Sequence, residues 1–312
     1  MTTLSFLILA VLQALLLLLA APLLSGFTRV MRARMHSRRG PGLLQDYRDI
    51  LKLLKRQDVT PPASGIVFRA MPYIQIATML LVAMALPVLT RVSPVGGAGD
   101  LITVIYLFAL SRFFFSLSGI DSGSSFAGIG ASREMTMAIL IEPIMLLALM
   151  VTALLAGSTN IAGMGTAIAE GTIHAPLAAI LCAVAFAFAS YAEMGKLPFD
   201  MAEAEQELQE GPLTEYSGPS FALLKWGLSL KQVVVVALFL SVFVPFGSPA
   251  EPSFLGLIGG LAVFAVKIVA AFAIAALIEN SMARGRFLMT ARVTWAGFGT
   301  ATLAFVFFLA GL

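Results

Sequence analysis

The stretch LSFLILAVLQALLLLLAAPLLSGF, from Leu4 to Phe27, carries no charged side chain. A helix needs about 20 predominantly apolar residues to cross a bilayer core, and this run is long enough. It lacks the basic leader and small-residue exit of a cleaved signal peptide, so we expect a retained span. The whole chain agrees, since 59% of its 312 residues are hydrophobic and 12% are charged, against roughly 25% charged in soluble domains. The sequence therefore predicts an integral membrane protein.

Further apolar runs of similar length follow along the chain. Together with the first, they lie near residues 4–27, 66–90, 100–118, 135–157, 175–194, 227–246, 254–278 and 294–312. We therefore predict an all-α integral membrane protein, a single membrane domain over residues 1–312 with about eight transmembrane helices. The long loops are expected at residues 28–65 and 195–226, and the glycine- and serine-rich stretch 119–133 is expected to be a tight loop.

Lysine and arginine are unevenly distributed between the two sides of this predicted bundle. Seventeen of the twenty fall on the side of the two long loops, only Arg91 falls on the other, and Arg112 and Lys267 fall inside spans. Cytoplasmic loops of membrane proteins carry the excess of positive residues. We therefore expect both long loops to be cytoplasmic, and both termini to be on the other side of the membrane.

The first long loop contains a helical pattern between Leu43 and Gln57. Apolar residues recur at helical spacing with basic residues between them, which predicts a cytoplasmic amphipathic helix. Two interpretations remain open, a helix lying at the interface and attracted to anionic lipid, or a docking surface for a cytoplasmic partner. The candidate docking side chains are Arg38, Arg39, Arg48, Lys52, Lys55 and Arg56.

An acidic segment, EMGKLPFDMAEAEQELQEGPLTEYSG, occupies residues 193–218 and contains seven acids and one lysine. On a helix, Asp200, Glu203, Glu207 and Glu210 would share one face, and Asp200 with Glu203 has the spacing of a capping box. Like charges at such spacing repel. The segment is either a solvated acidic helix or a cluster that binds cations, pairs with basic loops or exchanges protons. For the cluster as a whole we favour the second interpretation.

Ionisable side chains inside spans are functional candidates, because charge is costly in the bilayer. Glu142 lies within the fourth predicted span, Lys267 near the middle of the seventh and Arg112 within the third. A buried acid and base of this bundle form either a structural ion pair or steps of a proton relay. Glu279, Glu134 and Arg112 lie near enough to the interface to snorkel, so their signal is weaker. The candidates for a proton path are Glu134, Glu142, Glu193, Asp200, Glu203, Glu205, Glu207, Glu215 and Lys267.

Residues for independent chemistry are scarce. There is one cysteine, Cys182, and the two histidines, His36 and His174, fall in loops on opposite sides of the predicted bundle. We therefore expect no metal site, no iron–sulfur cluster, no bis-histidine haem and no other cofactor in this chain. No nucleophile–histidine arrangement and no P-loop is present, and nucleic-acid binding is not indicated. We predict no catalytic residue.

Four motifs together resemble those of a known family. They are RRGPG at residues 38–42, SRE at residues 132–134, KLPFDMAEAEQELQEGPLTEYSG at residues 196–218 and ENSMARGRFLM at residues 279–289. With them, essentially the whole chain resembles the heel subunit of respiratory NADH:quinone oxidoreductase, a family shared with membrane-bound NiFe hydrogenases. The residues of these motifs are most similar to those of the formate hydrogenlyase and hydrogenase-4 branch.

The resemblance implies a membrane-anchoring and proton-coupling subunit of a group 4 NiFe hydrogenase complex in the bacterial cytoplasmic (inner) membrane, with periplasmic termini. The implied partners are the hydrogenase large and small subunits, iron–sulfur subunits and antiporter-like membrane subunits, with the NiFe centre and iron–sulfur clusters in those partners. It also favours the docking interpretation of the basic loop. Departures from the respiratory pattern, such as Gly42, disfavour quinone binding. A quinone-binding heel subunit and a stand-alone cation or proton transporter are the alternatives.

The same resemblance implies roles for individual acids. The positions that match the family's acidic path are Glu134, Glu193, Asp200, Glu203, Glu205, Glu207 and Glu215.

Overall fold

A computed structural model of the protein describes residues 3–202, 205–250, 253–283 and 287–312. Over these residues the regular structure is helical, apart from one isolated antiparallel bridge between Asp100 and Asn160. The helices are α1 (Thr3–Met35), α2 (Gln45–Leu54), α3 (Ile66–Ala85), η1 (Gly96–Gly99), α4 (Leu101–Asp121), α5 (Ser125–Ala156), α6 (Ile161–Glu170), α7 (Pro176–Glu193), α8 (Glu205–Leu208), η2 (Gly211–Leu213), α9 (Gly218–Phe243), α10 (Phe254–Ser281) and α11 (Phe287–Ala310).

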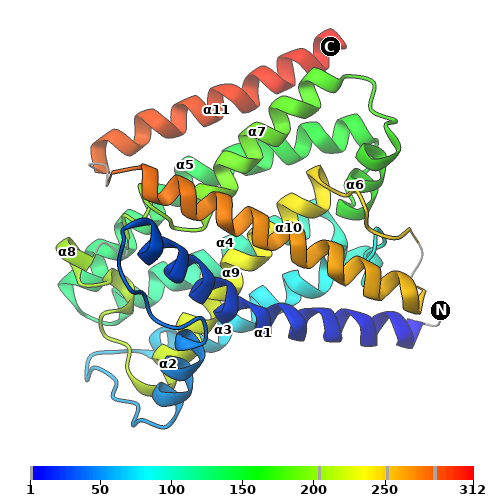
Figure 1. Ribbon diagram of the computed structural model, residues 1–312. Helices are drawn as coiled ribbons and strands as arrows, with labels where there is room; N and C mark the ends of the chain where they lie inside the picture. Colours follow the sequence, from blue (N-terminus) through cyan, green and yellow to red (C-terminus); the bar gives the residue numbers. More distant parts are fainter. Residues whose placement is uncertain (1–2, 203–204, 251–252, 284–286) are drawn as a thin grey trace.

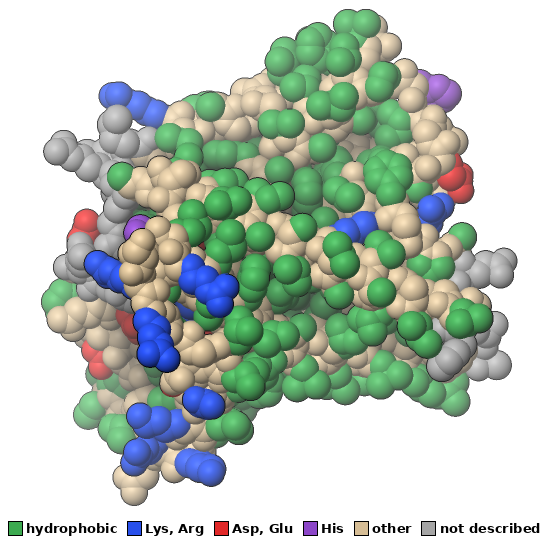
Figure 2. Space-filling model, in the orientation of Figure 1, with side chains coloured by type: hydrophobic (Ala, Val, Ile, Leu, Met, Phe, Trp, Pro, Cys, Tyr) green, Lys and Arg blue, Asp and Glu red, His purple; other side chains and the backbone are tan. Residues whose placement is uncertain are grey.

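Eight of the described helices are long and apolar enough to cross a membrane: α1, α3, α4, α5, α7, α9, α10 and α11. The predicted all-α membrane fold with eight spans is therefore confirmed. Hydrophobic side chains cover much of the face shown in Figure 2, as contact with lipid requires. The two termini lie at the same end of the bundle (Figure 1), as an even number of spans dictates.

Helix α9 is the central element of the bundle. It is the most buried of the spans, whereas α10 and α11 are the least buried. Its sequence is hydrophobic on all sides, as is typical of a helix surrounded by others, and it packs against α1, α3, α6 and α7. A polar bond stabilises the contact with α1, since Trp226 Nε1 donates to the Leu18 carbonyl at 2.8 Å. A second bond joins two neighbours of α9, since Gln13 of α1 donates to the Ala83 carbonyl of α3 at 2.7 Å.

Several helices begin or end outside the predicted limits. Helix α1 continues to Met35, and α9 begins at Gly218 rather than near residue 227. The earlier start of α9 places Lys225 inside this span, where Lys231 was already expected, although the charge count had assigned both cations to the cytoplasmic side. Lys231 is accommodated because it pairs with the carboxylate of Glu193.

The tight loop predicted at residues 119–133 is wrong. Helix α4 continues to Asp121 and α5 begins at Ser125, so the turn is three residues long. The small residues of this stretch serve close packing of helices. A Cβ on Gly119 would lie 2.9 Å from the carbonyl oxygen of Ala127, and one on Gly130 would lie 2.7 Å from the Cα of Gly211.

The predicted amphipathic helix is confirmed as α2, which packs against α1 and α9. It buries Ile50 and leaves Leu51 exposed among basic residues. The Tyr47 hydroxyl donates to the carbonyl of Leu19, and burial raises the pKa of Tyr47 above its ordinary value, so this donor stays protonated. Helix α6, between the fourth and fifth spans, was not predicted; Asn160 caps it by accepting from the Ala162 amide at 2.9 Å.

Candidate functional site

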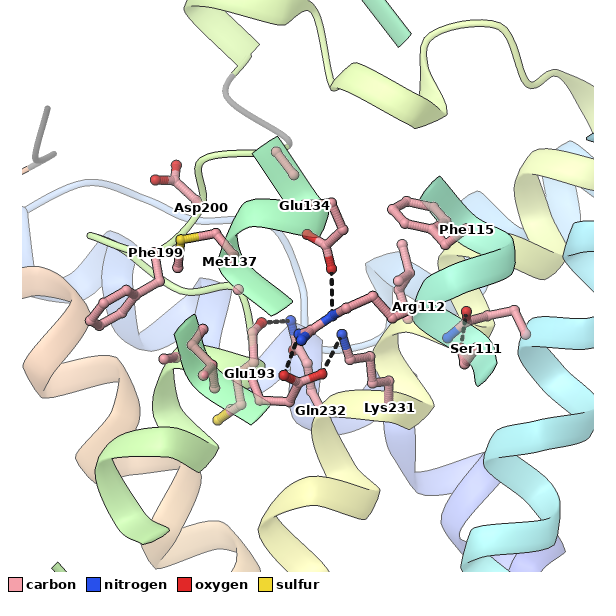
Figure 3. A pocket seen from close by; sticks show the side chains of 17 residues that line it. Ser111, Arg112, Phe115, Glu134, Met137, Glu193, Phe199, Asp200, Lys231 and Gln232 are labelled. Atoms are coloured by element: carbon pink, nitrogen blue, oxygen red, sulfur yellow. Dashed lines mark hydrogen bonds and ion pairs between the residues drawn. The ribbon is translucent and has the colours of Figure 1, made fainter. Parts of the chain in front are cut away.

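The side chain of Arg112 is buried where α4, α5 and α7 meet, and its guanidinium contacts three carboxylates. Figure 3 shows two of them, Glu134 and Glu193. The Nε of Arg112 lies 3.0 Å from Oε1 of Glu134, and its Nη1 lies 3.2 Å from Oε1 of Glu142. Its Nη2 pairs with Oε2 of Glu193, the last residue of α7. A guanidinium presents five donors in a rigid fork, so one side chain can hold acids from two different helices.

A second cation completes this group. Lys231 of α9 places its Nζ 2.8 Å from Oε1 of Glu193, whose side chain is 2% exposed. Each oxygen of this buried carboxylate therefore faces a cation, which is the condition under which a charge is retained in a protein interior. We call Arg112, Lys231, Glu134, Glu142 and Glu193 the Arg112 cluster. It holds three carboxylates against two cations.

A polar cavity of about 70 Å³ lies beside the Arg112 cluster. Ser111 donates to Oε1 of Gln75 at 2.6 Å on its wall, and Nε2 of Gln75 is buried without a partner among the described residues. A water molecule needs about 10–15 Å³ of such volume and two or more polar partners. The cavity therefore has room and hydrogen-bonding groups for several waters in contact with the charged side chains.

The described part of residues 194–217, between α7 and α9, folds over the Arg112 cluster, and we call it the covering segment. Gly211 and Tyr216 determine its path. Gly211 has a φ of +55°, and a Cβ there would lie 2.0 Å from the carbonyl oxygen of Ala202, so only glycine fits. Tyr216 stacks on Phe68 of α3 with ring centroids 3.9 Å apart and donates to its carbonyl at 2.8 Å. Burial raises the pKa of Tyr216 above its ordinary value, which keeps this donor protonated.

The predicted acidic helix with one shared face is wrong for the described residues. Asp200 is not helical, α8 is a single turn from Glu205 to Leu208, and Glu210 has a left-handed φ of +70°. The predicted capping box of Asp200 and Glu203 depends on Glu203, which lies outside the described residues. The cause is tertiary: the buried side chains of this segment pull it against α4 and α5. They are Met201, Ala202, Leu208, Pro212 and Leu213.

The other predicted acids take separate positions. Glu207 is 56% exposed and pairs with Arg133 at 2.6 Å. Asp200 lies on the covering segment with its carboxylate directed away from Arg112 (Figure 3). Glu215 is half-buried beside Tyr216, and the side chain of Glu205 is outside the described part of the structure. Of the nine predicted proton-path residues, three therefore meet in the Arg112 cluster.

Asp200 also borders a second polar cavity, of about 370 Å³, formed by α1, α9, α10 and the covering segment. Arg32 of α1 and Lys196 each lie 3.5 Å from the carboxylate of Glu279, the acid near the end of α10. Asp200 lines both cavities. The covering segment thus separates two polar spaces at the same end of the bundle.

Lys267 lies apart from the Arg112 cluster. Its Nζ donates to the carbonyl of Val244 at 2.7 Å, at the end of α9. Glu142 consequently pairs with Arg112 and not with Lys267. Of the two bases that the sequence left open as partners of a buried acid, Arg112 is therefore the one that pairs with Glu142.

The predicted docking residues are all exposed, and they gather at one end of the bundle. Lysine and arginine side chains cluster around α2 and the end of α1 in Figure 2. The exposed residues of the predicted set are Arg38, Arg39, Arg48, Lys52, Lys55 and Arg56. The described part of this chain leaves these side chains uncovered, so they can meet lipid headgroups or another protein.

Two residues of the Arg112 cluster were not among the predicted sites. Arg112 was assigned a weak signal because it lies near the end of its span, and Lys231 was counted only among the cytoplasmic cations although it lies inside the predicted span 227–246. The signal that could have found Arg112 is its position inside the apolar run 101–115, since a charge there needs a partner. The same signal applies to Lys231, which lies inside the predicted span 227–246.

The eight-span bundle identifies the chain as a multi-pass membrane protein, and the Arg112 cluster is a group of ionisable side chains buried inside it. The chain belongs to the NADH dehydrogenase family, whose model matches residues 7–310. The family resemblance seen in the motifs is therefore confirmed.

Among curated proteins, the chain is 57% identical over 305 residues to hydrogenase-4 component C of Escherichia coli K12, covering 98% of this chain and 96% of that protein. It is 56% identical over 298 residues to formate hydrogenlyase subunit 4 of the same organism, covering 96% and 97%. An NADH-quinone oxidoreductase subunit of Methylococcus capsulatus is 32% identical over 274 residues, covering 86% and 83%. These identities also confirm the hydrogenase branch of the resemblance.

Among solved structures, a chain of the membrane-bound sulfane sulfur reductase, an archaeal respiratory membrane complex, superposes with a TM-score of 0.83. It is 25% identical and covers 97% of this chain and 99% of that one.

Proposed function

We propose that this chain is the membrane-anchoring and proton-coupling subunit of a group 4 NiFe hydrogenase complex of the formate hydrogenlyase and hydrogenase-4 type. The observation that carries the proposal is the 57% and 56% identity, over nearly complete chains, to two proteins bearing those names, against 32% to the NADH-quinone oxidoreductase relative. In this proposal the NiFe centre and iron–sulfur clusters belong to the hydrogenase large and small subunits and the iron–sulfur subunits. Antiporter-like membrane subunits complete the complex.

The distribution of positive charge supports one orientation of the bundle across the membrane. The basic side chains around α2 and the covering segment lie at one end of the bundle, and positive residues favour the cytoplasm. We place this end in the cytoplasm, where it meets the hydrogenase subunits, and both termini in the periplasm. The six exposed cations of the predicted docking set would then contact an acidic surface of a partner.

The Arg112 cluster supports the coupling role. A proton relay needs groups whose charged and neutral forms are both accessible, and water or side chains between them. Glu134, Glu193 and Glu142 share one arginine, so a proton taken up by one acid alters the field at the other two. The 70 Å³ polar cavity beside them provides room for the connecting waters. In this proposal protons pass between the covering segment and Glu142, within the membrane-spanning part of α5.

The test uses the whole complex, purified and reconstituted in vesicles. Glu134→Gln and Glu193→Gln should each reduce proton-linked turnover at least tenfold, while the dye-linked activity of the hydrogenase subunits stays unchanged. Glu207→Gln is the matched control, because it removes an acid from the same region but from the exposed surface. Unchanged proton-linked turnover in both cluster variants would contradict the coupling role.

Two other functions predict different results. The 32% identity to the NADH-quinone oxidoreductase relative favours a quinone-binding heel subunit as the second candidate, and quinone-site inhibitors would then block electron flow. A stand-alone cation or proton transporter would be active in vesicles after purification by itself. Co-purification with NiFe and iron–sulfur proteins, together with resistance to quinone-site inhibitors, supports the hydrogenase proposal.

A further inference from the structure

A groove of about 750 Å³ runs along the outer side of α4 and α5. Its walls are almost entirely apolar. Tyr106 of α4 and Ile139 of α5 line it and are each 70% exposed, so the groove opens toward the bilayer. The two charged residues that reach it are Arg112 and Glu142 of the Arg112 cluster.

Glu142 is the member of the cluster that faces outward. Its side chain is 35% exposed, against 16% for Glu134 and 2% for Glu193, and it lies near the middle of α5. Its Oε1 accepts from Arg112, whereas no donor among the described residues reaches its Oε2. A carboxylate at this depth is costly when it faces hydrocarbon, because lipid tails offer no hydrogen bond.

The charge balance of the Arg112 cluster and the backbone of α5 both strengthen the need for a donor in the groove. Three carboxylates against two cations leave one negative charge in the Arg112 cluster without a counter-charge. Pro143 follows Glu142 inside α5 and has no amide hydrogen, so it cannot give the carbonyl of Ile139 its usual helical bond. The groove thus presents a carboxylate and a backbone acceptor in an apolar setting. The occupant that fits is apolar, elongated and carries one cationic donor.

We propose that the α4–α5 groove seats a transmembrane helix of a neighbouring subunit, which presents a lysine or arginine to Glu142. This inference rests on the proposed function, since it takes the chain to be one of several membrane subunits. The partner's cation supplies the missing counter-charge and donates to Oε2 of Glu142. Glu142 is then the group through which the Arg112 cluster meets the neighbouring subunit.

A second copy of this chain does not fit the groove as well. Three cations lie at least nine residues from both ends of their described spans, and of these Arg112 and Lys231 have side chains only 4% and 13% exposed. Lys267 already donates to the carbonyl of Val244. A cation at the required depth must therefore come from a different protein.

The first experiment is photo-crosslinking in the intact complex. A benzophenone amino acid replaces Ile139 in the groove or, as a matched control, Val266 of α10, which is 71% exposed. The expected adduct at position 139 is a membrane-spanning peptide of another subunit that contains a lysine or arginine, identified by mass spectrometry. Adducts at position 139 only with lipid, with a second copy of this chain or with a span lacking a cation would overturn the proposal, as would no protein adduct.

The second experiment blocks the groove. Both side chains are exposed on this chain by itself, so Ile139→Trp and Val266→Trp should leave the amount of this chain in membranes unchanged. Ile139→Trp should lower recovery of the crosslinked membrane subunit at least fivefold, while Val266→Trp should not; equal recovery would overturn the docking site. The hydrogenase subunits should co-purify with both variants. Their absence from the unmodified complex would instead contradict the proposed function, so the two failures are distinguishable.

Discussion

Arg112 and Lys267 are both cations inside spans, yet the bundle surrounds them differently. Arg112 is on α4 and faces α5 and α7, where three carboxylates meet a side chain only 4% exposed. Lys267 is on α10, one of the least buried spans, and donates to one backbone carbonyl. Both lie far enough from the ends of their helices that depth does not distinguish them. The face of the helix on which the charge lies decides its surroundings.

The two sites also differ in what holds the charge. The partners of Arg112 are carboxylates, each of which can bind a proton, so the balance of charge around it can change. The partner of Lys267 is a carbonyl at the end of α9, part of the negative end of a helix dipole, which is fixed. The first arrangement suits a site that exchanges protons, and the second suits an anchor between α9 and α10.

The largest expected effect comes from removing the central cation. Arg112→Leu leaves three acids without their shared partner, and breaking a buried ion pair on one side costs about 3–5 kcal/mol. We expect a lower melting temperature in detergent and a lower yield of the subunit in membranes, partly restored in Arg112→Lys. Lys267→Met, which loses one hydrogen bond, should cost only about 1 kcal/mol. Equal losses in the two variants would refute the distinction between the sites.

A smaller effect is expected from Lys231→Met. Glu193 keeps Arg112 but loses the donor on Oε1, which should cost about 1–3 kcal/mol. Because the two residues are in contact, the double variant with Glu193→Gln should be less destabilised than the sum of the single variants, with a coupling energy of about 0.5–3 kcal/mol. Thermal unfolding of the four proteins measures this, and strict additivity would mean that the pair contributes nothing.

Gly211→Ala tests the segment that covers the Arg112 cluster, a cover that Lys267 lacks. The new Cβ would clash with the carbonyl of Ala202 in a left-handed conformation, and such strain costs of order 1–3 kcal/mol. We expect faster proteolysis within residues 194–217. Gly259→Ala of α10 is the control, because a Cβ there meets nothing within 4 Å and alanine favours helix. Similar proteolysis of both variants would show that the fit of Gly211 does not hold the segment.

The spans could be predicted from sequence because apolar runs of sufficient length identify membrane helices regardless of their packing. Their ends were less predictable: α9 starts at Gly218 and includes Lys225, whereas hydropathy alone begins this span near residue 227. The acidic segment has helical spacing, but the fit of Gly211 against Ala202 and the stacking of Tyr216 determine its path. These are contacts between distant residues, which a local pattern does not contain.

The Arg112 cluster shows the same limit. Glu134 and Glu142 are eight residues apart on one helix, so the sequence places them on one face. Their meeting with Glu193 and Lys231 depends on how α4, α5, α7 and α9 pack, which the sequence pattern leaves open. The acids were identified because acids inside spans are unusual. Their bases were missed because each lies near a predicted boundary.

The smallest expected effect is at the exposed pair of Glu207 and Arg133. Like the Arg112 cluster, this pair joins a carboxylate to a guanidinium, but Glu207 is 56% exposed. Exposed pairs contribute about 0–1 kcal/mol. Glu207→Gln should therefore change the melting temperature by no more than a degree or two, and added salt should remove even that difference. A loss as large as that of Lys231→Met would mean that Glu207 is buried in the assembled complex. In that case the contrast between buried and exposed acids would hold for the isolated chain only, and the covering segment itself would be part of a subunit interface.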